Sequence, residues 1–206
     1  MGRRTTVCGR YQIDEKTAKE IKKIIHLADE NVRKRASINF QMQARDLHPT
    51  ETAPVLTASD SGLECNLKRW ELPGFQGKQV LFNARSESAL EKKSFREGME
   101  HRRIVILAVW FYEWNRNKEK NTFYRKGKPI LFMAGIYNHY EAGDCFIILT
   151  TQANVSVKPI HDRMPLVLEE NKIIPWIFDR QKTMEYFRKV PCLLERKAEY
   201  EQLSLL

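Results

Sequence analysis

The stretch RIVILAVWFYEW, residues 103–114, decides the fold. Its apolar and aromatic residues do not alternate with polar ones, which predicts an extended segment buried on both faces. TFYRKGKPILFMAGIY at 122–137 and CFIILTT at 145–151 have the same character, and the turn signals KGKP and EAGD separate the apolar runs. These stretches predict the central strands of a β-sheet.

Shorter extended segments surround this centre. We expect strands in PVLTAS at 54–59, LECNLKRWEL at 63–72 and KQVLFNARSE at 78–87, because the turn signals Ser-Asp-Ser-Gly and Pro-Gly-Phe-Gln-Gly lie between them. RMPLVLEE at 163–170 is a further candidate strand. Residues 36–54 read as an irregular surface loop.

Helices are expected at three places. The clearest covers residues 14–35, where Asp14 is a suitable N-cap and apolar residues recur at helical spacing at Ala18, Ile21, Ile25, Ala28 and Val32. SALEKKSFREGME at 88–100 and DRQKTMEYFRKV at 179–190 predict the other two. Without regular strand-helix alternation, this order predicts an α+β fold with a mostly antiparallel, barrel-like sheet and about three peripheral helices.

Length and composition indicate one domain over residues 1–206, without internal repeats or a low-complexity linker. No apolar run approaches the roughly 20 residues that span a bilayer, and the N-terminus has no secretory signal. We therefore expect a monomeric, soluble protein without a membrane partner, located in the cytoplasm and associated with the nucleoid if bacterial. The net charge of +9 favours a polyanionic partner, but lysines on solvated helix faces explain it equally well.

The four cysteines are scattered and form no Cys-x-x-Cys pair, so neither a zinc ribbon nor a disulfide framework is expected. Cys65, Cys145 and Cys192 lie near apolar residues and are expected to be buried thiols. Cys8 follows the polar segment MGRRTT and has no such cover. Phosphate-binding, zinc-protease and serine-esterase motifs are absent from the sequence, and we expect neither a metal nor a cofactor.

Polar side chains share one face of the predicted strand in FNARSE, residues 82–87. Because alternate residues of a strand point the same way, Asn83, Arg85 and Glu87 are expected side by side. Amide and guanidinium groups suit a phosphate or carboxylate ligand. A strand with one solvated face explains the same pattern, so both interpretations stay open.

Glu113 lies inside the apolar stretch, between two aromatic residues. Desolvation there would raise the pKa of its carboxyl group towards neutrality, as in enzymes that use a glutamic acid for proton transfer. The alternative is that Glu113 emerges at the strand end and pairs with Arg116 or a nearby lysine.

His161 lies in the sequence IHDRMP, in a loop that follows a predicted strand. Functional side chains often collect in such loops, and a histidine titrates near neutral pH. A structural or merely exposed histidine, beside a local ion pair between Asp162 and Arg163, is the alternative.

Four short motifs follow one another along nearly the whole chain: CGRY at 8–11, NARSE at 83–87, WFYEW at 110–114 and HDRMP at 161–165. Together they resemble the SOS-response-associated peptidase family, also called abasic-site processing proteins. The resemblance implies a protein that binds single-stranded DNA with an abasic site and caps the lesion covalently through an N-terminal cysteine. It also implies self-processing that frees the cysteine, with possible lyase activity and the replication machinery as a candidate partner.

By the same resemblance, Cys8 is the nucleophile and attachment point, Glu113 relays protons, and His161 assists ring opening, closure or reversal. The chemistry is sensible, because the amine of a terminal cysteine can form an imine with the aldehyde of an abasic sugar. Its thiol can then close a thiazolidine ring. An α-amine, with a pKa near ~8, is partly neutral and nucleophilic at physiological pH.

The resemblance also assigns DNA-binding roles. It implies that Asn83 and Arg85 hold the abasic nucleotide and its phosphate, and that Arg10 contacts a backbone phosphate. Aromatic residues around Glu113, including Trp110, are expected to shield the site or to stack on a neighbouring base.

The sequence departs from the family pattern at its start. The family usually begins Met-Cys-Gly-Arg, whereas here seven residues precede Cys8. Because an amide nitrogen is not nucleophilic, we expect residues 1–7 to be a non-native or removed extension. Either Val7 marks the true start, through a GUG codon decoded as Met, or the chain cleaves itself before Cys8.

Two further departures affect the expected DNA site. The loop ARDLHPTETAP at 44–54 carries Asp46 and His48 in place of expected residues, and Trp110 stands near the position where the family usually has a small residue. Trp110 either narrows the cleft or supplies another stacking surface.

Two other functions compete with this interpretation. One is an N-terminal-cysteine amide hydrolase or peptidase that forms no DNA adduct. The other is a non-catalytic nucleic-acid-binding module whose basic surface contacts phosphates. We favour the DNA-capping protein, because neither rival explains why the four motifs occur together.

Overall fold

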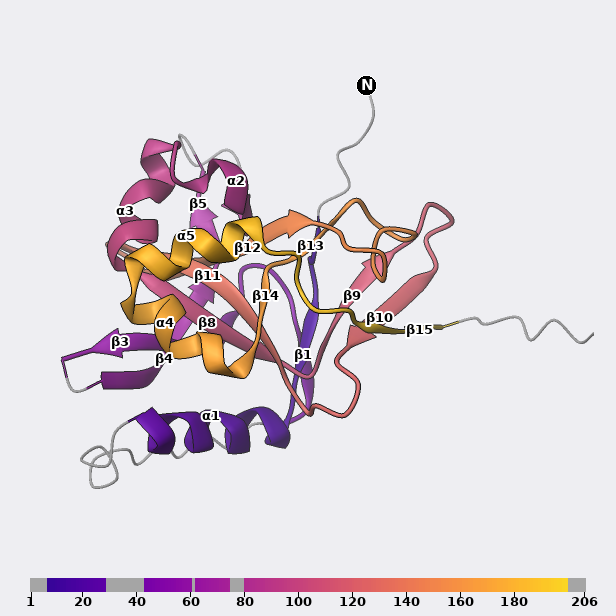
Figure 1. Ribbon diagram of the computed structural model, residues 1–206, viewed down its shortest axis with the longest axis horizontal. Coiled ribbons are helices and arrows are strands. Elements are labelled where there is room, and N and C mark those ends of the chain that lie inside the picture. The colour runs from indigo at the N-terminus through magenta and orange to yellow at the C-terminus, as the bar shows by residue number, and fades with distance from the viewer. Residues whose placement is uncertain (1–6, 29–42, 61, 75–79, 200–206) are drawn as a thin grey trace, which may run out of the picture.

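The computed structural model describes residues 7–28, 43–60, 62–74 and 80–199 (Figure 1). The strands are β1 Tyr11–Ile13, β2 Arg45–Leu47, β3 Thr52–Ser59, β4 Gly62–Trp70, β5 Leu72–Pro73, β6 Val80–Leu81, β7 Asn83–Arg85, β8 Arg103–Ala108, β9 Trp110–Trp114, β10 Lys120–Tyr124, β11 Leu131–Tyr140, β12 Gly143–Gln152, β13 Arg163–Pro165, β14 Val167–Leu168 and β15 Glu195–Ala198. The helices are α1 Glu15–Ala28, α2 Ser86–Ala89, α3 Lys93–His101, α4 Ile173–Phe178 and α5 Arg180–Arg188, with a 3-10 turn at Glu170–Lys172. The predicted α+β class is confirmed.

Five strands close into a barrel. The ring runs β12-β4-β3-β8-β11 and returns to β12, and only its β12–β4 pair is parallel. Along β8, Ile104 and Ile106 belong to one core cluster, whereas Val105 and Leu107 belong to a second cluster that includes helical residues. Both faces of β8 are therefore buried, which explains the absence of alternation in its sequence.

A second, antiparallel sheet has the order β15-β10-β9-β1-β2. The chain crosses from the barrel to this sheet at Val109, whose backbone N–H donates to the carbonyl of Gln12 at 2.8 Å. Residues 103–114 therefore form two strands in two sheets, not the single strand that their composition suggests. Figure 1 shows β9, β10 and β15 on one side of the molecule and α3, α4 and α5 over the other.

The helix that begins near Asp14 is confirmed as α1. The carboxylate of Asp14 accepts from the backbone N–H groups of Lys16 and Thr17, which is an N-terminal cap. Ile21 and Ile25 are buried, as the spacing predicts. The expected continuation of this helix through Val32 lies outside the described residues.

The region around residues 78–101 differs from its prediction. The strand expected over 78–87 is interrupted: β6 and β7 are short, and α2 begins at Ser86. Glu87 is therefore helical and does not continue the strand face of Asn83 and Arg85. The described residues form five α-helices where we expect about three, because the helix predicted over 88–100 is split and α4 has no prediction. None of these helices is long and apolar enough to cross a membrane.

Candidate active site around Cys8

Cys8 is fully buried, with 0% of its surface exposed, and Val7 beside it is 7% exposed. The expectation that Cys8 lacks cover is wrong. The reason is that β1 begins three residues later and pairs with β9, which draws this segment into the core cluster that contains Tyr11 and Phe111. Burial, and then the charge of Glu113, raises the pKa of the Cys8 thiol well above its ordinary value. The four cysteines are free. Cys145 is buried as predicted, whereas Cys65 and Cys192 are only partly buried.

Glu113 is buried as well, with only 3% of its surface exposed. Its Oε1 accepts a hydrogen bond from the backbone nitrogen of Cys8 at 2.6 Å. Burial raises the pKa of the Glu113 carboxyl group from 4.5 to about 8, and the hydrogen bond from Cys8 opposes this only in part. The carboxyl group is thus mostly protonated at neutral pH, and it does not emerge to meet Arg116.

Asn83 approaches the same peptide group from the other side. Its Nδ2 donates to the carbonyl oxygen of Val7 at 2.5 Å. The strand β7 that carries Asn83 is fixed by parallel pairing with β12 and by a 2.8 Å hydrogen bond from the Trp70 indole to the Phe82 carbonyl. The peptide bond between Val7 and Cys8 is therefore held at its oxygen by Asn83 and at its nitrogen by Glu113.

Backbone strain lies at this position as well. Cys8 has a φ of 48°, in the left-handed region that residues with a side chain rarely adopt. Such strain persists only where the surroundings over-determine the conformation, and it is common at functional sites.

His161 is partly buried. Its Nδ1 accepts from the backbone N–H of Arg163 at 2.9 Å, so Nε2 carries the proton in the neutral ring. Nε2 is buried and has no hydrogen-bond partner among the described residues. His161 lines a cavity of about 440 Å³ together with Trp114, Arg116 and Lys158, and no hydrogen bond in the described part of the chain joins its side chain to Cys8 or Glu113.

The local ion pair between Asp162 and Arg163, which was the alternative interpretation, is absent from the described residues, and Arg163 forms a longer-range pair instead. The guanidinium of Arg163 binds both carboxylate oxygens of Glu87 at 2.8 Å each, and it also donates to the Thr150 carbonyl at 2.6 Å. Sequence reasoning missed this role, although both residues belong to the recognised motifs. The pair ties the segment that carries His161 to α2, directly after Asn83 and Arg85.

The DNA-binding candidates are spread more widely. Arg85 is exposed at the end of β7. Trp110 lies on the opposite face of β9 from Glu113, because the two positions differ by an odd number of residues. Arg10 lies 3.8 Å from Asp46 and 5.3 Å from the Trp114 ring, on the Trp110 face. The structure thus brings Cys8, Glu113 and Asn83 together, and it places Trp110 elsewhere.

Known proteins resemble this chain over most of its length. The family model described as "SOS response associated peptidase (SRAP)" matches residues 7–204. Abasic site processing protein YoqW of Bacillus subtilis is 30% identical over 166 residues, covering 70% of this chain and 74% of that protein. YedK of Escherichia coli, named in the same way, is 34% identical over 131 residues, 60% of this chain and 59% of that protein. The similarly named YMR114C of Saccharomyces cerevisiae is 31% identical over 136 residues, and the match covers 60% of this chain but only 36% of the yeast protein.

Solved structures share the fold. A protein from Bacteroides thetaiotaomicron has a TM-score of 0.73 and 22% identity, with 94% of this chain and 93% of that chain covered. A protein from Bordetella bronchiseptica has a TM-score of 0.71 and 22% identity, with 94% and 100% covered. Because the family model matches residues 7–204, a range that includes all described residues, the chain belongs to the SOS response associated peptidase family.

Proposed function

We propose that this protein binds abasic sites in single-stranded DNA and links to them covalently through Cys8. The relatives in three organisms are named abasic site processing proteins, which supports the class of lesion. The observation that carries the proposal is the 2.6 Å contact between the Cys8 nitrogen and the Glu113 carboxyl group. This contact sets a proton-transfer group, with a pKa of about 8, against the atom that has to react.

The first step is removal of the residues before Cys8. While Val7 is attached, the Cys8 nitrogen is an amide, and the fully buried thiol is out of reach of a ligand. Self-cleavage adds water across the Val7–Cys8 bond, so that the carbonyl carbon gains OH and the Cys8 nitrogen gains H. Asn83 donates to the oxygen that becomes negatively charged, and Glu113 protonates the leaving nitrogen. If translation starts at residue 7 instead, removal of that first residue opens the same bond.

The freed aminothiol then reacts with the ring-opened abasic sugar. The amine of Cys8 adds to the aldehyde carbon, and loss of one water gives an imine. The thiol adds across the C=N bond, with sulfur on carbon and hydrogen on nitrogen, which closes a thiazolidine ring. Glu113 gives a proton to the departing hydroxyl group and recovers one from the nitrogen. The role of His161 in ring closure and reversal rests on the family resemblance alone.

The DNA contacts follow from the same step. Once residue 7 has left, the Asn83 amide loses its partner and can donate to the sugar or phosphate oxygen of the bound nucleotide. Arg85, exposed on the same strand, contributes charge to that phosphate. A non-catalytic binding module would leave the buried contact between Glu113 and Cys8 without a purpose.

The test is a mass spectrum of a chain that begins at Cys8, mixed with an abasic single-stranded oligonucleotide. We expect one adduct whose mass is the sum of the two components minus one water, stable in SDS. An oligonucleotide without the lesion, and a chain that retains Val7 and cannot be cleaved, should give none. Cys8→Ser keeps the amine but not the thiol, so it should form only the imine, which is stable in SDS only after reduction with borohydride. Absence of an adduct with the Cys8-first chain would refute the proposal.

A further inference from the structure

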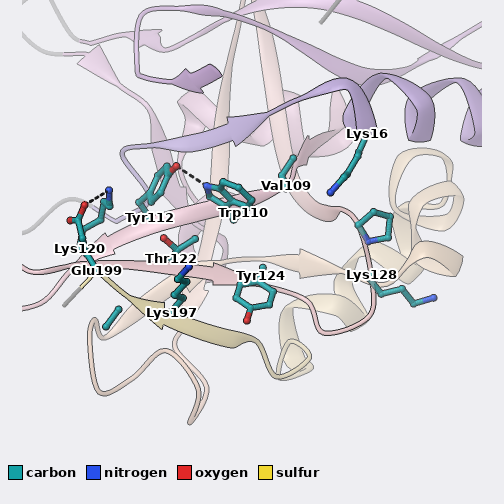
Figure 2. Close-up of a pocket in the computed structure, with 12 residues that line it drawn as sticks. Lys16, Val109, Trp110, Tyr112, Lys120, Thr122, Tyr124, Lys128, Lys197 and Glu199 are labelled. Atoms are coloured by element: carbon teal, nitrogen blue, oxygen red, sulfur yellow. Dashed lines mark hydrogen bonds and ion pairs between the residues drawn. The ribbon is translucent and has the colours of Figure 1, made fainter. Parts of the chain in front are cut away.

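The face of β9 that points away from Glu113 borders a cavity of about 630 Å³ (Figure 2). Its aromatic lining comes from Trp110 and Tyr112 of β9 and Tyr124 of β10, and lysines from α1, β10 and β15 border it. This volume lies within the range of pockets that hold small organic ligands. None of the roles assigned to Cys8, Asn83, Glu113 or His161 uses this cavity.

Trp110 is fixed in a way that leaves only its ring face for a ligand. Its indole N–H donates to the hydroxyl of Tyr112 at 2.6 Å, and that hydroxyl donates to Asp46 at 2.9 Å (Figure 2 shows the first bond). The hydrogen-bonding capacity of the indole is therefore already used inside the protein. A rigid, partly exposed aromatic surface of this kind suits stacking on a planar ring.

Positive charge surrounds this surface. Lys16, Lys120, Lys128 and Lys197 line the cavity, and the one acidic lining residue, Glu199, pairs with Lys120 at 2.9 Å. Three lysines thus remain to attract an anion. A ligand that combines a planar aromatic ring with a negative group fits the lining, and a nucleotide has both parts.

We propose that this cavity binds a base and phosphate of single-stranded DNA, as a second contact beside the lesion site. The inference rests on the proposed function, since the strand is the one that carries the abasic nucleotide. Asp46 links the two places. It is 3.8 Å from the guanidinium of Arg10, two residues after Cys8, and it accepts a hydrogen bond from the Tyr112 hydroxyl group that binds the Trp110 indole. Stacking is sequence-tolerant, so the contact serves any base next to a lesion.

The test is the affinity of the full chain for a labelled, undamaged single-stranded oligonucleotide, measured by fluorescence anisotropy over a series of salt concentrations. Trp110→Ala should weaken binding about 5- to 150-fold, the range for loss of one stacked base. A plot of log affinity against log salt has a negative slope. Lys197→Ala, at an exposed position on β15, should reduce the magnitude of that slope by about 0.7. Phe178→Ala and Lys93→Ala remove an exposed aromatic ring and an exposed lysine elsewhere, and should change neither quantity.

The outcomes separate this inference from the proposed function. If Trp110→Ala and Lys197→Ala bind undamaged DNA as the unaltered chain does, the cavity is not a DNA contact, even where the Cys8 adduct still forms. If an acidic peptide quenches Trp110 fluorescence and the oligonucleotide does not, the cavity is a peptide site and the inference is wrong. Loss of the adduct alone, with the effects at Trp110 and Lys197 intact, would refute the proposed function and leave the second contact standing.

Discussion

The backbone nitrogen of Cys8 lies 2.6 Å from Oε1 of Glu113, although 105 positions separate the two residues in the chain. Pairing of β1 with β9 creates this proximity, because it sets Tyr11 opposite Phe111 and brings the preceding residues beside the end of β9. Asn83 completes the arrangement from β7. The peptide group before Cys8 is therefore surrounded by groups that can polarise its carbonyl and protonate its nitrogen.

Glu113→Gln tests the proton-transfer role. Glutamine keeps the size of the side chain and an acceptor oxygen for the Cys8 nitrogen, but it cannot exchange a proton. In a chain that begins at Cys8, we expect the single-turnover rate of adduct formation to fall about 10²- to 10⁴-fold, without loss of thermal stability. Glu141→Gln, at an exposed turn position, is the matched control. A Glu113→Gln rate within threefold of the unaltered chain would exclude this role.

The pH dependence of stability follows from the same carboxyl group. Its pKa is raised from 4.5 to about 8 in the folded chain, so the folded state favours the neutral form. The contribution of this carboxyl group to the free energy of unfolding is therefore fully present below pH 4.5, and it is lost as the pH rises through about 8. The difference corresponds to about 5 kcal/mol. Denaturant unfolding at pH 5, 6.5 and 8.5 should show this loss of unfolding free energy in the unaltered chain and not in Glu113→Gln. If the unfolding free energies of the two chains change with pH in parallel, the prediction is wrong.

Asn83→Ala tests how the bond before Cys8 is opened. Loss of the donor to the Val7 carbonyl should slow release of residues 1–7 about 10²- to 10³-fold, as for removal of one oxyanion-stabilising donor. Intact mass against time measures the release, and Asn171→Ala, at an exposed position, is the control. An unaltered full chain that keeps residues 1–7 indefinitely would rule out self-cleavage.

The pair of Arg163 and Glu87 should position the His161 segment. Arg163→Lys loses the two-point contact, so we expect slower adduct formation with unchanged affinity for undamaged DNA. In unfolding experiments, a double-mutant cycle on Arg163 and Glu87 should give a coupling energy of about 0.5–3 kcal/mol. The pair of Arg180 and Glu100, in which the arginine is exposed, is the control, with an expected coupling energy of less than about 1 kcal/mol. Equal couplings would mean that the first pair is only a surface contact.

Gly135→Ala tests the packing of the barrel. A Cβ at this position would lie 2.6 Å from Cδ1 of Ile106 and 2.6 Å from the carbonyl oxygen of Ile147. We expect the free energy of unfolding to fall by about 1–3 kcal/mol. Adding Ile106→Val should restore only part of the lost unfolding free energy, because the clash with the carbonyl oxygen of Ile147 remains. Full restoration would place the whole clash at the Ile106 side chain.

Local chemistry and pattern determined the parts of the fold that the sequence predicts. Asp14 caps α1 through atoms two and three residues away, and the unbroken apolar run before Val109 specifies a strand buried on both sides. Because alternate residues of β9 point to opposite faces, Trp110 and Glu113 lie on different sides of the strand. The sequence contained this information, but the prediction that Trp110 lies beside the lesion did not use it.

Only the tertiary structure decided the burial of Cys8, the break between β8 and β9, and the partner of Arg163. Each depends on which strand pairs with which, across separations of many tens of residues. The strands β1 and β2 are three residues long and β15 four, too short to carry a periodic pattern. The motifs thus named the reacting groups, whereas long-range strand pairing set the distances between them, because hydrogen bonding across a sheet depends on the whole fold.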